Sequence, residues 1–179
     1  MSTGSSDTRP FGKWFHVRWA ERLGDPRNPY LVRYTFILFG RSIRFHHWLR
    51  SDDRRFFHDH SANLLSIVLK GYYRNVVPID PDKEPSASNK RKIFVAGMFN
   101  SLHCLLNWKN SVWFSKATAR HFLDIPKEGA WTLLLEGKKY HKWGFYVPRA
   151  KDPSGKVRKM RPLAYFHKYG IIQSDRRYQ

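Results

Sequence analysis

The amino-acid sequence predicts an all-β fold, either a barrel or a sandwich. Aromatic residues make up 16% of the 179 residues, and their side chains suit the pleated, half-buried surface of a β-sheet. Short apolar or alternating runs are separated by turn signals along most of the chain, which is typical of barrels and sandwiches. The length and the 41% hydrophobic content suffice for one domain with a single core.

The first part of the chain places strands after a polar leader. Residues 1–10 are polar and are predicted to be disordered. Residues 11–29 end in a clear turn signal, and the apolar residues before that turn fit either a short helix or a strand. Residues 30–38 and 42–49 are predicted strands, and 51–55 is a charged turn.

The middle of the chain combines apolar strands with a polar insertion. Residues 64–69 form an apolar run, and Gly71 marks a bend before a further predicted strand at 72–77. Residues 78–92 contain three prolines and seven charged residues, so we expect a long, mobile polar insertion. Residues 99–108 fit either a pair of strands or one helical turn.

The last third of the chain divides at Pro148. Before it, four segments are predicted strands: residues 111–115, 116–125, 131–137 and 143–147. After it, nine Lys or Arg face two acids, and 163–169 is predicted as a short helix that packs on the barrel. We therefore expect a leader at 1–10, a barrel domain at 11–148 and a basic, partly helical or irregular C-terminal extension at 149–179.

Composition limits the classes of protein. The single cysteine, Cys104, rules out a disulfide or a Cys-rich zinc site within one chain and favours a reducing compartment. No apolar run approaches the ~20 residues of a membrane helix, and residues 1–10 lack the apolar stretch of a secretory signal. We expect a cytoplasmic protein that does not bind membranes.

The net charge predicts an affinity for polyanions. The chain carries 33 Lys and Arg against 14 Asp and Glu, a formal charge of +19. Such an excess raises affinity for nucleic acids through phosphate neutralisation and counterion release. A generally basic, solubilising surface is the alternative interpretation, because the charge is spread along the chain rather than gathered in one block.

Two histidines, His58 and His60, precede the apolar run at 64–69. Side chains at i and i+2 of a strand point to the same face, so these imidazoles converge and Asp59 points the other way. We expect the third ligand to be His121, 61 positions after His60 on another predicted strand. Three imidazoles leave coordination positions open, as catalytic metal sites do.

The pattern around these histidines resembles the cupin superfamily. The pair His58 and His60, the following apolar strand and Gly71 are similar to the first cupin motif, and His121 stands where the second motif has its single histidine. The segment from Arg54 to Val147 also resembles small cupin-like proteins, many of them encoded by phages. The resemblance implies a double-stranded β-helix, also called a jelly-roll barrel, in a bacterial or phage-infected cell.

This sequence departs from the family at one ligand. The usual motif has a glutamate near the position of Leu64, but no acid occurs between Ser61 and Val77. The remaining set resembles the three-histidine sites of thiol dioxygenases and related oxygenases, which implies Fe(II). Imidazole ligands alone also suit Zn, Mn, Ni or Cu, so the ligand set does not select the metal.

Two functions compete. The resemblance implies a metal-dependent enzyme, a non-haem iron oxygenase acting on a small, anionic or nucleotide-linked substrate. Tyr72, Trp131 and Trp143 are candidates for its substrate pocket, although aromatic residues at such positions are usually core. The alternative is a non-catalytic basic module that binds nucleic acid or serves as a structural component. A homodimer is a further expectation from the family.

Four other residues near these motifs have weaker assignments. Asp59 either orients a ligand or caps a turn, and Arg120 is expected to pair with an acid at the surface. His46 and His47 are adjacent, so they point apart and are expected to be packed or at the surface rather than ligands.

Overall fold

The computed structural model describes residues 8–11, 15–25, 28–52, 55–149, 154 and 156–169. Over these residues the chain is an all-β jelly roll of antiparallel strands with a short C-terminal helix, which confirms the predicted fold class. No helix in the described ranges is long and apolar enough to cross a membrane.

Twelve strands and four short helices make up the described structure. The strands are β1 (Thr8–Phe11), β2 (Phe15–Asp25), β3 (Asn28–Leu38), β4 (Arg41–Trp48), β5 (Phe57–His58), β6 (Leu64–Val77), β7 (Arg91–Ala96), β8 (Val112–Ser115), β9 (Phe122–Asp124), β10 (Ala130–Glu136), β11 (Phe145–Pro148) and β12 (Val157–Met160). The helices are η1 (Ala87–Asn89), α1 (Leu102–Leu106), η2 (Trp108–Ser111) and α2 (Pro162–Tyr169).

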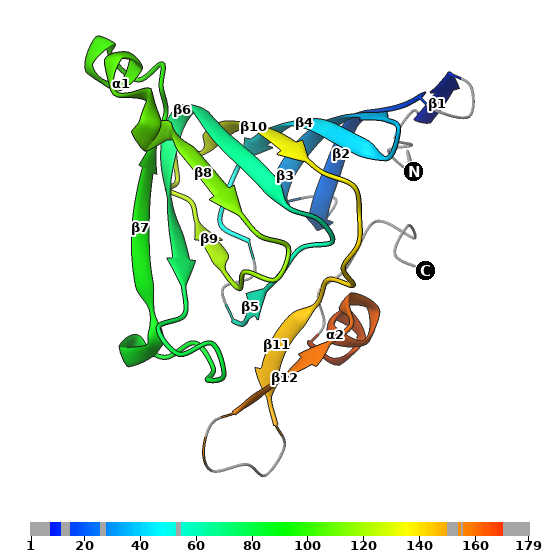
Figure 1. Cartoon of the computed structure of the whole chain (residues 1–179), viewed down its shortest axis with the longest axis vertical. Coiled ribbons are helices and arrows are strands. Elements are labelled where there is room, and N and C mark those ends of the chain that lie inside the picture. Colours follow the sequence, from blue (N-terminus) through cyan, green and yellow to red (C-terminus); the bar gives the residue numbers. More distant parts are fainter. Residues whose placement is uncertain are drawn as a thin grey trace.

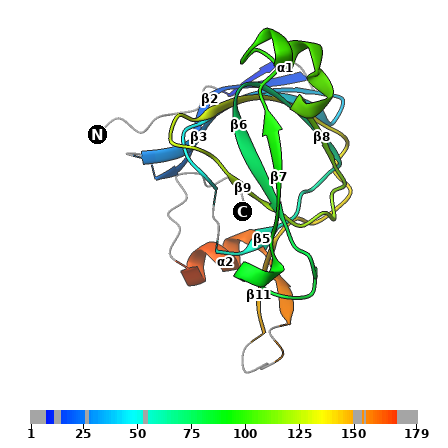
Figure 2. The ribbon, with the colours of Figure 1, turned by 90° about the vertical axis from the view of Figure 1, so that its left-hand side faces the viewer.

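The strands surround a barrel. One sheet runs β1-β2-β3-β4-β10-β6, and β8 pairs with the other edge of β6. Figure 1 shows β7 and β9 to the left of β2 and β3, and Figure 2 shows the strands arranged in a ring. The hairpin between β3 and β4 turns at Phe39 and Gly40, whose φ angles of 49° and 74° suit the two-residue turn of a tight hairpin.

Strand β6 bends at Gly71 and belongs to two sheets. Its first half pairs with β10 and β8, and its second half pairs with β7 and β9. The sequence predicted two strands separated at this glycine, whereas the structure has one strand of 14 residues. Gly71 has a φ of +78°, which a glycine adopts without strain, so the backbone turns a corner without ending the strand.

A separate small sheet has the strand order β12-β11-β5. It adjoins the barrel where His58 of β5 pairs with His121, the residue before β9. Helix α2 covers the small sheet, and the ring of Tyr165 stacks on Phe145 of β11 at 3.8 Å. Tyr165 is fully buried, so the helix predicted at 163–169 is present and packs against this sheet. The division of the chain into a barrel domain and an extension stays a prediction.

Several local predictions need correction. Residues 8–10 of the predicted leader form β1 together with Phe11, because the edge strand β2 offers backbone groups for pairing, and residues 1–7 lie outside the described range. The sequence of two further segments fits either helix or strand. Residues 15–25 form a strand, and residues 99–108 contain the helix α1. The strand predicted at 116–125 shrinks to β9, because only those residues find a partner in β6.

The polar insertion at 78–92 is folded around a buried amide. Asn89 is 5% exposed, and its side-chain carbonyl accepts a hydrogen bond from the Asp80 amide at 2.6 Å. Its amide nitrogen donates to the carbonyls of Asp80, Lys83 and Glu84 at 2.9–3.2 Å. The insertion is therefore a folded loop, because one side chain supplies the hydrogen bonds that its backbone lacks, and its mobility stays a prediction.

The inward-facing residues of the first sheet change from apolar to polar along the barrel. At one end Leu31, Trp48 and Ala130 are register partners, and they pack with Val68 and Tyr73 in the main core. Toward the other end, many of the inward-facing positions on β4, β10, β6 and β8 carry polar groups. We call this set the polar interior: Ser42, Arg44, His46, Ser66, Trp113, Thr132 and Glu136.

Candidate metal centre

His58 and His121 face each other across two antiparallel segments. The His58 amide donates to the His121 carbonyl and the His121 amide donates to the His58 carbonyl, both at 2.9 Å. A pair that exchanges both hydrogen bonds holds its side chains on the same face of the sheet. The two rings accordingly lie 5.0 Å apart between centroids.

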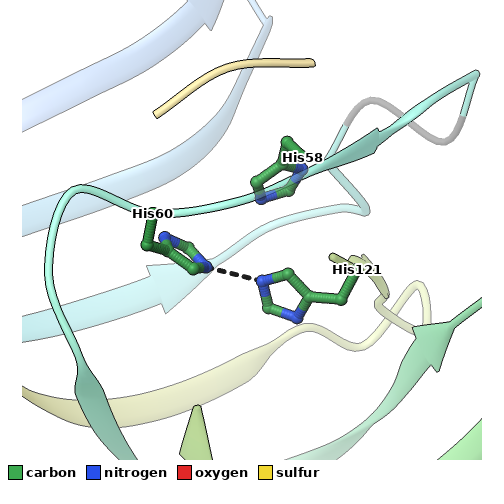
Figure 3. Close-up of side chains that lie close together, drawn as sticks. All are labelled: His58, His60 and His121. Carbon is green, nitrogen blue, oxygen red and sulfur yellow. Dashed lines mark hydrogen bonds between the residues drawn. The ribbon is translucent and has the colours of Figure 1, made fainter. Parts of the chain in front are cut away.

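His60 completes a triad with these two residues (Figure 3). Its amide donates to the Ala117 carbonyl at 2.9 Å, and its ring lies 5.4 Å from that of His58 and 4.8 Å from that of His121. One nitrogen from each of the three rings lies within 4.8 Å of the others. Although β5 ends at His58, the alternation predicted for a strand continues to His60, and the structure brings together all three predicted ligands.

Asn75 orients the ring of His121. The Asn75 side-chain carbonyl lies 2.7 Å from Nδ1 of His121, and both residues are buried. A carbonyl oxygen only accepts, so Nδ1 carries the proton and Nε2 presents its lone pair. Fixing one ring nitrogen through a hydrogen bond is how proteins orient a metal-ligating histidine. The Nε2 atoms of His121 and His60 then lie only 2.6 Å apart.

Burial keeps the imidazoles of His60 and His121 uncharged at neutral pH. Burial lowers the pKa of His121 well below its usual value of 6.5, and the neighbouring His60 and His58 lower it further. Burial likewise lowers the pKa of His60, with added effects from His58, Arg44 and His46. Neutral imidazole is the form that binds a metal. Near His58, an Asp52 oxygen lies 3.8 Å from Nε2, while its other oxygen accepts the Leu123 amide at 2.9 Å.

Asp59 points away from the triad, as predicted, but into a buried cluster. It is fully buried and accepts hydrogen bonds from the Gly144 amide at 2.7 Å and from the Tyr146 hydroxyl at 2.8 Å. The Lys159 ammonium and Nε2 of His141 lie 2.5 and 2.7 Å from the same carboxylate. Asp59 therefore does more than cap a turn, because it ties the segment between two candidate ligands to β11 and β12.

Arg120 contributes to the outer side of this cluster. Its guanidinium lies 3.7 Å from the centroid of the Tyr146 ring and 3.6 Å from the carboxylate of Asp82. The acid partner expected for Arg120 is present, and the stacking on Tyr146 is additional. Burial and the hydrogen bond to Asp59 raise the pKa of Tyr146 to about 12, so its hydroxyl stays a donor.

The three aromatic residues predicted to line a substrate pocket lie in different places. Trp131 is 38% exposed and stacks on His47 at 4.1 Å, on the outer face of the first sheet. Tyr72 lies against Phe94 with ring centroids 5.2 Å apart. Trp143 lies 5.6 Å from Phe145, whose ring is 5.7 Å from that of His58. Their role in binding substrate stays a prediction.

The structure places a glutamate near the triad that sequence reasoning did not consider. Glu136 on β10 accepts hydrogen bonds from Ser42 at 2.8 Å and from Ser61 at 3.3 Å, and it pairs with Arg44. Among the described residues, the group whose side chains lie close enough to hold one metal ion consists of His58, His60 and His121 and does not include Glu136. The candidate centre therefore has three histidines and no carboxylate ligand.

No family model matches the sequence, and no curated protein matches it. Solved structures of cupin-fold proteins are similar to it. They include the Fe(II) form of HppE (11% identity, 69% of this chain, TM-score 0.44), oxalate oxidase with glycolate (13%, 61%, 0.39) and a variant of oxalate decarboxylase from Bacillus subtilis (11%, 96%, 0.39). The matches cover 56%, 47% and 37% of those chains, so this chain spans about half of the first two.

Three buried histidines make the stability of the metal-free protein depend on pH. Burial lowers the pKa values of His46, His60 and His121 in the folded chain, while the unfolded chain titrates near pH ~6.5. Below that pH the unfolded state binds more protons, so stability falls by up to about 1.4 kcal/mol per pH unit for each histidine. Urea denaturation at several pH values between about 7.5 and 5 measures this loss. Constant or rising stability on acidification would contradict it.

Proposed function

We propose that this protein is a metal-dependent enzyme in which His58, His60 and His121 hold one divalent transition metal. The observation that supports this most strongly is the triad itself: three nitrogens within 4.8 Å of one another, with Nε2 of His121 presented as a lone pair by Asn75. Three neutral imidazoles without a carboxylate form a set that leaves coordination positions open, as catalytic sites do.

Fe(II) is the metal we propose, and oxygenation of a small substrate is the reaction class. Bound iron would supply open positions for substrate and dioxygen. The protein's part is to hold the ligands, through the paired backbone of His58 and His121, the Asn75 hydrogen bond and the anchoring of Asp59. The single cysteine and the need for reduced iron both fit the cytoplasm, which is our proposed location. Zn, Mn, Ni and Cu are the competing metals.

Nitric oxide, a probe of open positions on Fe(II), tests the oxygenase proposal without knowledge of the substrate. The protein would be loaded with Fe(II) without oxygen, titrated with nitric oxide and followed by electron paramagnetic resonance. We expect about one nitric oxide per bound iron, because three protein ligands leave positions free. Zn(II)-loaded protein is the control and should give no such signal. Iron that binds tightly but takes up no nitric oxide would overturn the oxygenase proposal.

A second candidate function, polyanion binding, is favoured by the surface of the C-terminal unit. Between Gly137 and Tyr169 the described residues include no acid, and the following nine basic residues are all exposed. They are Lys138, Lys139, Lys142, Arg149, Lys156, Arg158, Lys159, Arg161 and Lys168. Such an excess of exposed positive charge attracts phosphates, so we propose that nucleic acid is the partner of this segment. The expected homodimer stays a prediction.

Salt dependence tests the nucleic-acid candidate. We expect the affinity for a fluorescent oligonucleotide to fall with salt, with a logarithmic slope of about −0.9 for each phosphate contacted. The double variant Lys138→Ala/Lys139→Ala should bind more weakly with a shallower slope. The control Lys109→Ala/Lys127→Ala removes the same charge elsewhere on the surface. Equal losses in both variants would show diffuse charge rather than a binding surface.

A further inference from the structure

The barrel interior contains buried polar atoms that the protein itself does not satisfy. Nε1 of Trp113, Nδ2 of Asn75 and Nε2 of His46 are buried and have no hydrogen-bond partner within the described structure. An indole N–H and an amide NH₂ can only donate. Leaving a buried donor unpaired is costly, so such groups call for an acceptor that arrives from outside the chain.

Trp113 faces into the barrel. It is the register partner of Ser66, which is 7% exposed and whose hydroxyl lies 3.2 Å from that of the buried Tyr73. The next residue on β8, Phe114, is 58% exposed, as the alternation of a strand requires. The indole therefore lies on the inner face, on the same side of β6 as Tyr73. Tyr73 in turn precedes Asn75 by two positions on β6.

Arg44, on β4, lies on the same inner face of the sheet as Trp113. It lies in the same cross-strand row as Trp113, through Leu134 and Ser66. It pairs with Glu136, which also accepts a hydrogen bond from Ser61, the residue after His60. Its charge is among the causes that lower the pKa of His60. Although Arg44 faces inward, its side chain is 18% exposed to solvent, so solvent reaches this part of the interior.

The charge balance favours an anion. Three neutral ligands would leave the full double charge on a divalent metal. Of the carboxylates described near the triad, Glu136 is offset by Arg44 and Asp59 by Lys159, while Asp52 lies beside His58. Counting both pairs, the centre keeps a net positive charge in a largely buried place. Such a charge is stabilised by an anionic partner.

We infer that the substrate carries an oxyanion, a carboxylate or a phosphate-type group, which binds between the metal centre and the donors of the polar interior, with Trp113 as a direct hydrogen-bond donor. This inference rests on the proposed function, because the metal supplies part of the positive charge. The anion's oxygens accept from the indole N–H, and Arg44 stabilises its charge. Trp113 is thereby a binding residue that determines the class of substrate.

Cobalt substitution tests the two proposals separately. The untagged protein would be titrated with Co(II), whose visible spectrum reports ligands at the metal, and then with acetate and with inorganic phosphate. We expect Co(II) to bind and one of the two anions to change the spectrum, which also distinguishes a carboxylate from a phosphate substrate. Trp113→Phe keeps an aromatic ring but loses the donor, so it should take up Co(II) normally and bind that anion about tenfold or more weakly.

Trp19→Phe is the matched control, because this tryptophan on β2 is 57% exposed and is not part of the polar interior, so the variant should bind the anion like the wild type. Arg44→Lys is a second interior variant that keeps the charge and should weaken anion binding less than Trp113→Phe. If Co(II) does not bind, the proposed function fails and this inference with it. If Co(II) binds but neither anion does, or if Trp113→Phe binds the anion as tightly as the wild type, only this inference is overturned.

Discussion

Replacing His121 with alanine is expected to reduce the bound metal from about one equivalent to below about a tenth. His121 is the most buried member of the triad, at 6% exposure, and Asn75 fixes its tautomer. Removing it leaves two imidazoles, and two ligands do not hold a transition metal against competition from buffer and chelators. The measurement is metal content after reconstitution with Fe(II) and passage through a desalting column.

His167→Ala is the control for this variant. His167 is exposed on α2 and is not a member of the triad, so its loss should leave the metal content unchanged. Circular dichroism of both variants checks that the fold is retained. Metal content in His121→Ala equal to that of the wild type would mean that the metal is held elsewhere in the chain.

Replacing Gly71 with alanine is expected to destabilise the protein by at least about 3 kcal/mol. Gly71 has a φ of +78°, and a Cβ there would lie 2.6 Å from the Gly129 carbonyl oxygen and 3.1 Å from Cα of Ala130. Both contacts are with backbone, so β6 and β10 would have to separate at the bend. Urea denaturation measures the change in the free energy of unfolding.

Gly40→Ala separates the two causes of this loss. Gly40 also has a positive φ, +74°, but nothing lies within 4 Å of a Cβ built there. Its replacement should therefore cost only the backbone strain, about 1 kcal/mol. Equal losses at the two positions would show that the close approach of β6 and β10 at Gly71 contributes nothing.

The geometry of the triad was predictable because it depends on local rules. The i, i+2 alternation placed His58 and His60 on one face and Asp59 on the other, and the structure keeps this arrangement although β5 ends at His58. His121 was chosen because it lies on another predicted strand, and the family resemblance pointed to the same residue. Asn75 was missed, because it is 46 positions from His121 in the sequence and only the pairing of β6 with β9 brings the two residues together. No local pattern signals such a contact.

The polar interior could not be read from the sequence for a different reason. On β4 the alternation separates Ile43 and Phe45 from Arg44 and His46, and an apolar face usually lies inside. The structure does the reverse: Ile43 and Phe45 are 47% and 37% exposed, and His46 is 5% exposed. Local preference and burial disagree in this way mainly at functional sites, where polar groups are retained in the interior for binding. The inversion therefore supports a ligand-binding barrel.

The metal content of the wild-type protein, purified without a histidine tag and analysed by mass spectrometry of the elements, tests the central claim most directly. The arrangement of His58, His60 and His121 predicts about one equivalent of a transition metal per chain, retained through gel filtration and removed by a strong chelator. A protein that holds less than about a tenth of an equivalent, even after reconstitution with Fe(II), Zn(II), Mn(II), Ni(II) and Cu(II), would contradict the claim.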